Sequence, residues 1–211
     1  MISDRRLLEY AESVSSPESD LLRLLDRDTH LHVVAPNMLS GHIQGKFLEM
    51  ISHMIRPATI LEIGTYTAYG TICLAAGLRE GGILHTIESN IEIKGMIQTY
   101  LTKAGLDHRV KVHFGDALQI IPAFNEVFDL VFIDGAKEQY ISYYEMVFDK
   151  VRPGGFILAD NVLWGGKVLD EKPDTSTRAI LDFNCRVRDD RRVDNVLLPM
   201  RDGMMLIRKI S

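Results

Sequence analysis

The chain has 211 residues, of which 46% are hydrophobic and 25% are charged, and its formal net charge is −5. This length and apolar content suffice for one sizeable core, and the acidic balance excludes a global basic field of the kind that attracts nucleic acid. No apolar run approaches the length of a membrane span, so we expect a single domain over residues 1–211 that does not enter a membrane.

Helical patterns come first along the chain. Residues 1–35 are expected to form a helical N-terminal extension, with a helix start at Ser16–Pro17. A further helix is expected to follow, because apolar residues recur at helical spacing before Pro57 interrupts the pattern. These apolar positions are Ile43, Phe47, Met50, Ile51 and Met54.

Short apolar strands then alternate with helices. The expected strands end near residues 64, 88, 116, 134 and 161, and residues 195–210 form an expected hairpin that turns at Asp202–Gly203. Strand–helix alternation predicts an α/β fold, with a mostly parallel sheet and helices on both faces. Ligands of such sheets bind beyond the carboxyl ends of the strands.

Cysteine usage and local charge add two smaller expectations. Cys73 and Cys185 form no CxxC pair and lie in apolar-periodic stretches, which predicts buried free thiols in a reducing cytoplasm. The basic run at residues 186–192 is interrupted by Asp189 and Asp190. We interpret this run as a solvated helix end rather than a phosphate-binding patch.

Acidic and amide side chains recur where the predicted strands end. One acidic strand end is ordinary, but a succession of them predicts a lined cleft at one edge of the sheet. The residues are Glu62, Glu88, Asp116, Asp134, Asp160 and Asn161.

The loop after the first strand indicates what this cleft binds. Gly64 allows a tight turn or a close backbone approach, and Gly70 is the next glycine, so the dinucleotide fingerprint GxGxxG is absent. Glu62 suits an ammonium or sulfonium group better than a phosphate, and Glu88 stands where an acidic residue receives ribose hydroxyls. Asp116 either accepts from an adenine amino group or caps a helix. Together these acids favour S-adenosylmethionine (SAM).

The fourth and fifth strand ends predict a metal site. If these strands are neighbours, Asp134, Asp160 and Asn161 converge, and a divalent cation removes the repulsion between the two carboxylates. An all-oxygen set suits Mg²⁺, with Mn²⁺ or Ca²⁺ as alternatives. The other interpretation is that Asp134 pairs with Lys137 while the Asp160–Asn161 pair caps a turn. Beside a dication, Lys137 is biased toward the neutral amine and can accept a proton from a metal-bound hydroxyl, which would then attack a sulfonium methyl group.

Four stretches carry a resemblance to a known family: MLSGHIQGKFLEMI, LEIGTYTAYGTICLA, FDLVFIDGAKEQYISYYE and ADNVLWGGKV. From about Asn37 onward the chain resembles the cation-dependent O-methyltransferases, which include catechol O-methyltransferase and, more similar still, the caffeoyl-CoA O-methyltransferase group with its small bacterial members. The resemblance implies a Rossmann-like class I methyltransferase domain with a seven-stranded sheet, in a cytoplasmic homodimer.

The resemblance also implies roles for individual residues. Asp134, Asp160 and Asn161 would bind the metal, with Lys137 as the general base beside Asp134. Trp164 would line the acceptor pocket, although plain packing is an equal alternative. Residues implied in cofactor binding are Met38, Ser40, Glu62, Gly64, Gly70, Glu88, Asp116, Ala117 and Asp134. Within this set, Glu62 would hold the methionine ammonium and Glu88 the ribose.

Two positions depart from the family pattern. The family loop commonly has Gly-Tyr-Ser where this chain has Ala68, Tyr69 and Gly70, so a serine hydroxyl is missing. The family also often has Asp-Ala-Asp-Lys where this chain has a Gly135–Ala136 pair between the aspartate and the lysine. Neither change removes a predicted metal ligand or the base.

The leading hypothesis is Mg²⁺-dependent methyl transfer from SAM to one of two adjacent hydroxyls of an aromatic molecule, because such hydroxyls can chelate the metal together. One alternative is methylation of a hydroxylated uridine in tRNA, which a basic surface would favour. A nicotinamide-dependent oxidoreductase and a non-catalytic binding module are further alternatives. The identity of the acceptor does not follow from the sequence.

Overall fold

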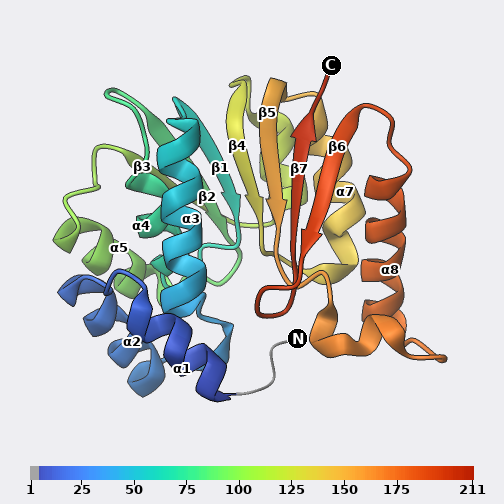
Figure 1. Cartoon of the computed structure of the whole chain (residues 1–211). Coiled ribbons are helices and arrows are strands. Elements are labelled where there is room, and N and C mark those ends of the chain that lie inside the picture. The colour runs from blue at the N-terminus through green and yellow to red at the C-terminus, as the bar shows by residue number, and fades with distance from the viewer. Residues whose placement is uncertain (1–4) are drawn as a thin grey trace.

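A seven-stranded sheet forms the centre of the fold in the computed structural model, which describes residues 5–211. The strand order is β3-β2-β1-β4-β5-β7-β6; β1 to β5 are parallel, and β7 runs antiparallel to β5 and β6 (Figure 1). The predicted α/β class, the mostly parallel sheet and the antiparallel C-terminal hairpin are therefore confirmed.

The strands coincide with the short apolar runs of the sequence. They are β1 (Thr59–Ile63), β2 (Ile83–Glu88), β3 (Val110–Phe114), β4 (Phe128–Ile133), β5 (Val151–Ala159), β6 (Val193–Leu198) and β7 (Met204–Lys209). The inner strands are mainly apolar because helices cover both of their faces.

Helices cover the two faces of the sheet. They are α1 (Arg5–Val14), α2 (Asp20–His32), α3 (Gly41–Ile55), α4 (Tyr69–Ala75), α5 (Lys94–Lys103), α6 (Ala117–Ile120), α7 (Tyr140–Phe148) and α8 (Thr175–Arg188). Five short 3₁₀ helices join them: η1 (Pro36–Met38), η2 (Ile91–Ile93), η3 (Ile121–Ala123), η4 (Lys137–Gln139) and η5 (Trp164–Leu169). Helices α2 to α5 pack on one face and α6 to α8 on the other (Figure 1). None of the helices in residues 5–211 is long and apolar enough to cross a membrane.

Alternation along each strand divides the core in two. In β4, Leu130 and Phe132 belong to the apolar cluster under α2 to α5, whereas Val131 and Ile133 belong to the cluster under α6 to α8. Successive side chains of a strand point to opposite faces, so one run of apolar residues supplies both clusters.

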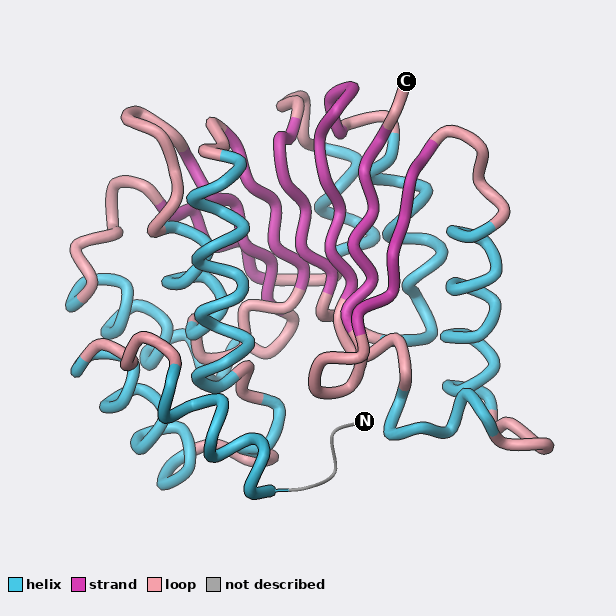
Figure 2. The backbone as a smooth tube through the Cα atoms, in the orientation of Figure 1, coloured by secondary structure: helices cyan, strands magenta, loops and turns pink. Residues whose placement is uncertain are grey.

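The register of the sheet positions the strand ends. Ile133 of β4 pairs with Ile63 of β1 on one side and with Ala159 of β5 on the other. The next residues along the chain therefore emerge side by side. Figure 2 shows the loops that follow β1 to β5 gathered at this one edge of the sheet.

Some predicted details differ from the structure. Strand β3 ends at Phe114, two residues before Asp116, which instead begins α6. Both cysteines are free, but only Cys73 is buried, so the expectation of a buried thiol at Cys185 is wrong. The apolar periodicity of α8 is real, but Cys185 lies on the exposed side of that helix. The first four residues of the predicted helical extension lie outside the described part of the chain.

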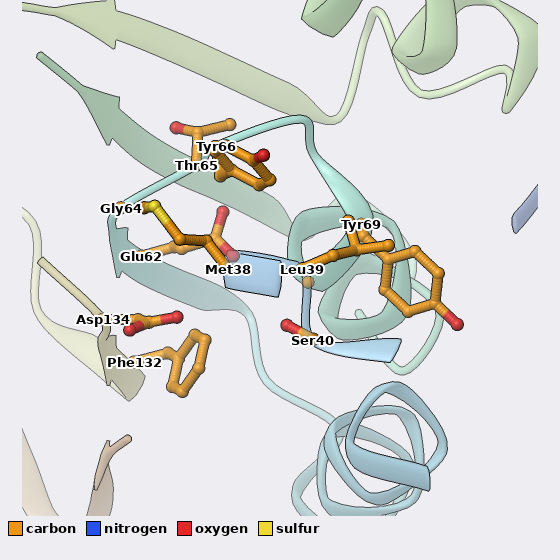
Figure 3. A pocket seen from close by; sticks show the side chains of 11 residues that line it. Met38, Leu39, Ser40, Glu62, Gly64, Thr65, Tyr66, Tyr69, Phe132 and Asp134 are labelled. Carbon is orange, nitrogen blue, oxygen red and sulfur yellow. The ribbon is translucent and has the colours of Figure 1, made fainter. Parts of the chain in front are cut away.

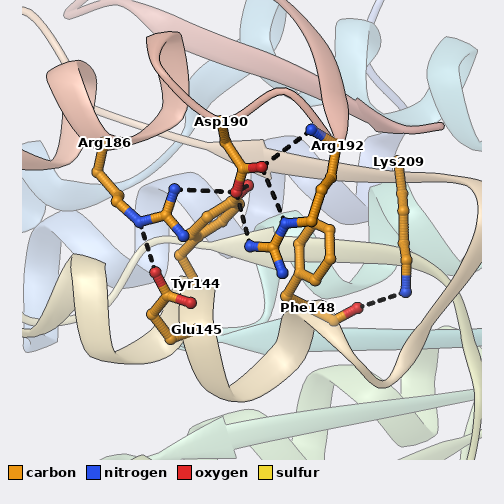
Figure 4. Close-up of polar contacts among 7 residues, drawn as sticks. All are labelled: Tyr144, Glu145, Phe148, Arg186, Asp190, Arg192 and Lys209. Atoms are coloured by element: carbon orange, nitrogen blue, oxygen red, sulfur yellow. Dashed lines mark hydrogen bonds and ion pairs between the residues drawn. The ribbon is translucent and has the colours of Figure 1, made fainter. Parts of the chain in front are cut away.

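The basic run at the end of α8 is folded back onto its own acids. Asp190 is buried and accepts hydrogen bonds from Tyr144 Oη at 3.0 Å, from Arg186 Nη1 at 2.9 Å and from Arg192 Nη2 at 2.7 Å (Figure 4). Arg186 also reaches Glu145 of α7. The guanidinium of Arg192 holds the pKa of Asp190 well below its usual range. The cluster therefore fastens α8 to α7 and is not a free phosphate patch.

A histidine pair between β2 and β3 is expected to make the free energy of unfolding depend on pH. Nδ1 of His85 lies 3.1 Å from Nε2 of His113, and Phe124 packs edge-on against both rings. Burial lowers the pKa of each histidine from 6.5, although Glu126, 3.9 Å from His85, opposes this shift. At these two sites the unfolded chain then binds more protons than the folded one just below pH 6.5, so the contribution of the pair to stability falls as the pH drops through that range.

We expect His113→Asn to flatten this acid-side loss of stability, because the variant has one depressed histidine fewer. The measurement is the free energy of unfolding in urea between pH 7.5 and pH 5. His53→Asn, on the exposed face of α3, is the matched control and should keep the wild-type slope. Equal slopes in wild type and His113→Asn would contradict the assignment.

Candidate active site

A cleft of about 840 Å³ opens at the carboxyl edge of the sheet. Its walls come from the lead-in between α2 and α3, from the loops after β1, β2, β4 and β5, and from the turn between β6 and β7. Among the sequence-predicted residues, Met38, Gly64, Glu88, Asp134, Lys137, Asp160, Asn161 and Trp164 line it. A smaller recess adjoins the cleft, and the predicted residues that line it are Met38, Ser40, Glu62, Gly64, Gly70 and Asp134 (Figure 3).

Glu62 is the charged group of this recess. It is 1% exposed, and its Oε2 accepts hydrogen bonds from the hydroxyls of Thr71 and Thr86. Burial raises the pKa of Glu62 to about 8, and the two hydroxyls oppose this shift. A buried acid of this kind gains from a cationic partner, which would stabilise its charged form.

Glu88 ends β2 and faces the large cleft. Its two oxygens accept backbone N–H groups from Tyr66, at 2.7 Å, and from Asn90, at 2.8 Å. These bonds fix the carboxylate at the edge of the sheet and tie the loop after β1 to the loop after β2.

Gly64 makes a close contact with the backbone of a neighbouring loop. Its φ is +104°, and a Cβ there would lie 2.2 Å from the carbonyl oxygen of Asp134. The structure thus requires glycine here for the approach of the β4 end, and a close approach of Gly64 to a ligand stays a prediction. The loop after β1 and the loop after β4 are therefore packed directly on each other.

Asp134 pairs with Lys137 in the structure. Lys137 Nζ lies 2.9 Å from Asp134 Oδ1 and donates to Tyr140 Oη at 2.7 Å. Tyr140 in turn donates to the carbonyl of Asp160 at 3.0 Å and is completely buried. A turn of η4 and the start of α7 thus hold the lysine beside the acid.

Asp160 follows the neighbouring strand and is 4% exposed. Its Oδ2 accepts from Nε2 of Gln44 at 2.5 Å, and its Oδ1 accepts from the backbone N–H of Asn161 at 2.7 Å. Burial and the negative charge of Asp134 raise the pKa of Asp160 to about 6. The two carboxylates therefore lie close enough to repel each other, and Asn161 lines the same cleft. Residues 5–211 contain no group of three or more His, Cys, Asp or Glu side chains able to hold a metal.

Trp164 stands at the far side of the cleft and also packs against the core under α6 to α8. Packing is therefore observed, and the role of Trp164 in an acceptor pocket stays a prediction. Its indole N–H is buried and has no hydrogen-bond partner in the described part of the chain.

Asp116 and Ala117 lie outside the lining of both cavities. Asp116 accepts a hydrogen bond from the N–H of Leu118 at 2.9 Å, which makes it the N-cap of α6. Capping, the alternative left open for Asp116, is the contact observed, and adenine binding by these two residues stays a prediction.

Unusual backbone conformations concentrate at the cleft. Of the seven non-glycine residues with positive φ among residues 5–211, five line it: Ala35, Tyr66, Asn161, Trp164 and Arg201. Left-handed conformations cost L-residues about 1–2 kcal/mol each and persist where the surroundings impose them. Their clustering marks this edge of the sheet as the functional one.

Three side chains of the site were not predicted from the sequence. Gln44 and Tyr140 hold Asp160 and Lys137, and Arg201 contributes a positive charge from the hairpin turn. Gln44 lies 116 positions from its partner, so no local pattern announces the contact. For Tyr140, the three-residue spacing from Lys137 across a helix start was the available signal.

The two departures from the family pattern can also be located. A Cβ at Gly70 would lie 3.1 Å from Glu62 Oε1 and 3.6 Å from Ser40 Oγ, so the Ser40 hydroxyl stands near the place where the family's serine would begin. Ala136 lines the cleft and is exposed. No acid at this position competes with Asp134 for Lys137.

Comparison with known proteins identifies the family. The family model described as O-methyltransferase matches residues 12–210. A catechol O-methyltransferase from Niastella koreensis is 35% identical over 82% of this chain and 80% of its own length, and caffeoyl-CoA O-methyltransferase 5 from Nicotiana tabacum is 30% identical over 82% and 78%.

Solved structures agree. The O-methyltransferase TomG from Streptomyces achromogenes, involved in tomaymycin synthesis and solved in complex with SAM, superposes with a TM-score of 0.92 and 28% identity over all of both chains. The SAH-bound methyltransferase PaMTH1 from Podospora anserina gives a TM-score of 0.90 and 26% identity over 98% of this chain and 94% of its own. These matches do not support the oxidoreductase or the non-catalytic alternative. The chain belongs to the O-methyltransferase family, and the prediction of a methyl-transferring enzyme is confirmed.

Proposed function

We propose that the protein transfers the methyl group of SAM to one hydroxyl of a vicinal dihydroxy aromatic molecule, with a divalent cation held at the ends of β4 and β5. The observation that carries this proposal is the juxtaposition of Asp134, Asp160 and Asn161 with Lys137, between the recess of Glu62 and the indole of Trp164.

SAM as the methyl donor is supported by the recess and by the ligands of the structural relatives. Glu62 would accept the methionine ammonium, which restores the charged form that burial disfavours. Ser40 and the backbone near Gly70 border the same recess, and Glu88 would receive the ribose hydroxyls. A cleft of this volume is within the usual range for small-molecule sites.

The donor atoms at the ends of β4 and β5 fit a hard divalent cation. They are carboxylate and amide oxygens, which suit Mg²⁺, Mn²⁺ or Ca²⁺ better than metals that prefer nitrogen or sulfur. The raised pKa of Asp160 reflects its burial and the repulsion from Asp134, and a positive charge nearby would counter both. Gln44 holds one Asp160 oxygen from α3, which fixes the direction of the carboxylate.

Lys137 is placed to handle the proton. When bound, the cation favours the ionised form of the acceptor hydroxyl, and SAM supplies an electrophilic methyl group. In its neutral form Lys137 would accept the hydroxyl proton at Nζ and become an ammonium, and Tyr140 Oη, 2.7 Å away, orients that nitrogen. Trp164 covers one side of the acceptor ring and excludes water from it.

The test is a methyl-transfer assay with catechol and caffeoyl-CoA as acceptors, with Mg²⁺ or with a chelator. We expect transfer in Mg²⁺ and a loss of at least about a hundredfold in chelator, with recovery when Mg²⁺ is added back. Full activity in chelator would exclude the metal mechanism. A thermal shift with SAM but not with NAD checks the cofactor independently of turnover.

Methylation of tRNA is the weaker candidate. The basic surface that would favour it is largely neutralised, because Arg186 and Arg192 pair with Asp190, and Arg188 pairs with Asp189. Steeply salt-dependent tRNA binding by the purified protein would revive this candidate.

Cytoplasmic location and a homodimer complete the proposal. Both cysteines are free, as the reducing compartment proposed for this chain would require. The homodimer is carried only by the family resemblance, and analytical ultracentrifugation distinguishes it from a monomer.

A further inference from the structure

The order of groups along the sheet edge separates a cofactor side from an acceptor side. The strand order places Glu88 of β2 and Glu62 of β1 on one side of the Asp134–Asp160 pair. On the other side of that pair lies the turn between β6 and β7, because β7 is the neighbour of β5. Any part of an acceptor that extends away from the cofactor therefore extends toward this turn.

Arg201 is the cation of the turn. It lines the large cleft together with Asn161 and Trp164, and its side chain is exposed. Its Nη1 donates to the carbonyl of Leu39 at 3.0 Å, and it forms no ion pair with a carboxylate of residues 5–211. A guanidinium has five N–H donors, so most of them remain available to a ligand.

Hydrogen bonds from a neighbouring segment hold the turn that carries Arg201. The segment after Asp160 donates backbone N–H groups to it, from Val162 to Gly203 at 3.1 Å and from Leu163 to Asp202 at 2.8 Å. Gly165 donates to the Asp202 side chain as well.

Arg201 itself has a φ of +49°, which is an unfavourable conformation for any residue with a Cβ. A strained backbone conformation at a residue that lines the cleft between Leu39 and Trp164 suggests a functional role.

We propose that Arg201 is a specificity-determining residue that binds a carboxylate on the acceptor, so that the preferred acceptors are dihydroxyphenyl compounds with a carboxylate on the ring or on a short side chain. This inference rests on the proposed function of the site. Arginine matches a carboxylate with two parallel hydrogen bonds, which gives both affinity and orientation. Four acids line the cleft, and the other strong cation of its lining, Lys137, is already paired with Asp134, so an anionic acceptor needs a further opposing charge. These acids are Glu88, Glu92, Asp134 and Asp160.

A neighbouring hollow of about 490 Å³ offers the opposite chemistry. Arg201 also lines it, together with Glu12, Glu18 and Asp26. A catecholamine could use these acids, but two of them are engaged: Glu18 accepts from the Tyr69 hydroxyl, and Asp26 lies 2.9 Å from His30. The carboxylate is therefore the better partner for this side of the cleft.

The test compares acceptors with and without charge. For wild type, Arg201→Gln and Arg201→Lys, kcat and KM are measured with 3,4-dihydroxybenzoate, catechol, dopamine and caffeoyl-CoA. Glutamine retains an N–H donor for Leu39 but removes the charge. We expect Arg201→Gln to raise KM for dihydroxybenzoate about tenfold with kcat retained and KM for catechol unchanged, and Arg201→Lys to fall between.

Three results would overturn the proposal. If Arg201→Gln changed KM for dihydroxybenzoate and for catechol equally, Arg201 would serve only to connect the turn to Leu39. An effect confined to caffeoyl-CoA would assign the guanidinium to a phosphate, and a wild-type preference for dopamine would assign specificity to the acidic hollow.

Failure of the proposed function itself gives a different result, namely no transfer to any of the four acceptors by wild type. Calorimetric titration of dihydroxybenzoate into wild type and Arg201→Gln then decides the role of Arg201 without turnover. Equal affinities, or no binding to either protein, would reject it.

Discussion

Replacing Asp134 by asparagine is expected to lower kcat/KM for methyl transfer by about a thousandfold. The substitution removes one of the two carboxylate charges proposed to hold the cation, and it removes the negative charge that pairs with Lys137 at 2.9 Å. It would therefore weaken binding of the cation that favours ionisation of the acceptor hydroxyl. It would also disturb the position of the Lys137 amine that takes the proton. The measurement is steady-state kinetics across a Mg²⁺ titration, with thermal denaturation to establish that the variant folds.

The chain supplies a matched control in Asp116→Asn. Asp116 also follows a parallel strand, but it is exposed, caps α6 and lies outside the cleft lining. Asparagine is as good an N-cap as aspartate, so this variant should retain stability and, if Asp116 serves only as a cap, activity within about twofold. Near-wild-type turnover by Asp134→Asn at saturating Mg²⁺ would remove Asp134 from the mechanism.

Gly64→Ala is expected to destabilise the fold by about 2–5 kcal/mol. The new Cβ would lie 2.2 Å from the carbonyl oxygen of Asp134, and φ at this position is +104°. Backbone atoms cannot rotate away as a flexible side chain can, so the loop after β1 or the end of β4 must move. The free energy of unfolding in urea measures the loss, and the affinity for SAM should fall with it.

Gly95→Ala is the control for this substitution. Gly95 lies in α5, and a Cβ there meets nothing within 4 Å. Alanine at such a helical position should leave stability unchanged or raise it by up to about 1 kcal/mol. A Gly64→Ala protein as stable as wild type would show that the two loops are not tightly packed.

The parts of the fold that follow local rules could be predicted from the sequence. The run from Phe128 to Ile133 is apolar at five of six positions, and the structure buries it on both faces of a central strand. Because parallel strands expose their carboxyl ends at one edge, the positions of Asp134 and Asp160 at the ends of two apolar runs predicted that both lie at that edge, and the pairing of β4 with β5 makes them neighbours.

The role of a residue could not be decided from the sequence where two local roles fit it equally well. Asp116 satisfies a helix start as well as it would satisfy an adenine, and only its position relative to the cleft separates the two roles. Gly64 raised the same difficulty, because a glycine needed for backbone contact has the same sequence signature as one needed for a ligand. Cys185 lies in an apolar periodic helix and is nevertheless exposed.

Long-range support could not be predicted. The contact from Gln44 to Asp160 joins α3 to the end of β5, and the bond from Arg201 to Leu39 spans 162 positions. Such contacts depend on how helices and turns pack on the sheet, which hydrophobic periodicity does not specify. The residues that orient the site are therefore less visible in sequence than those that do its chemistry.

The place of β7 in the sheet has a consequence for how the protein is made. This strand lies between β5 and β6, yet it is synthesised after all six others. Until it emerges from the ribosome, one edge of β5 lacks its partner, and the turn that anchors Val162 and Leu163 does not exist. The nascent chain thus carries an unpaired strand edge, which is prone to pairing with other chains, and the acceptor side of the site can assemble only after β7 has been released.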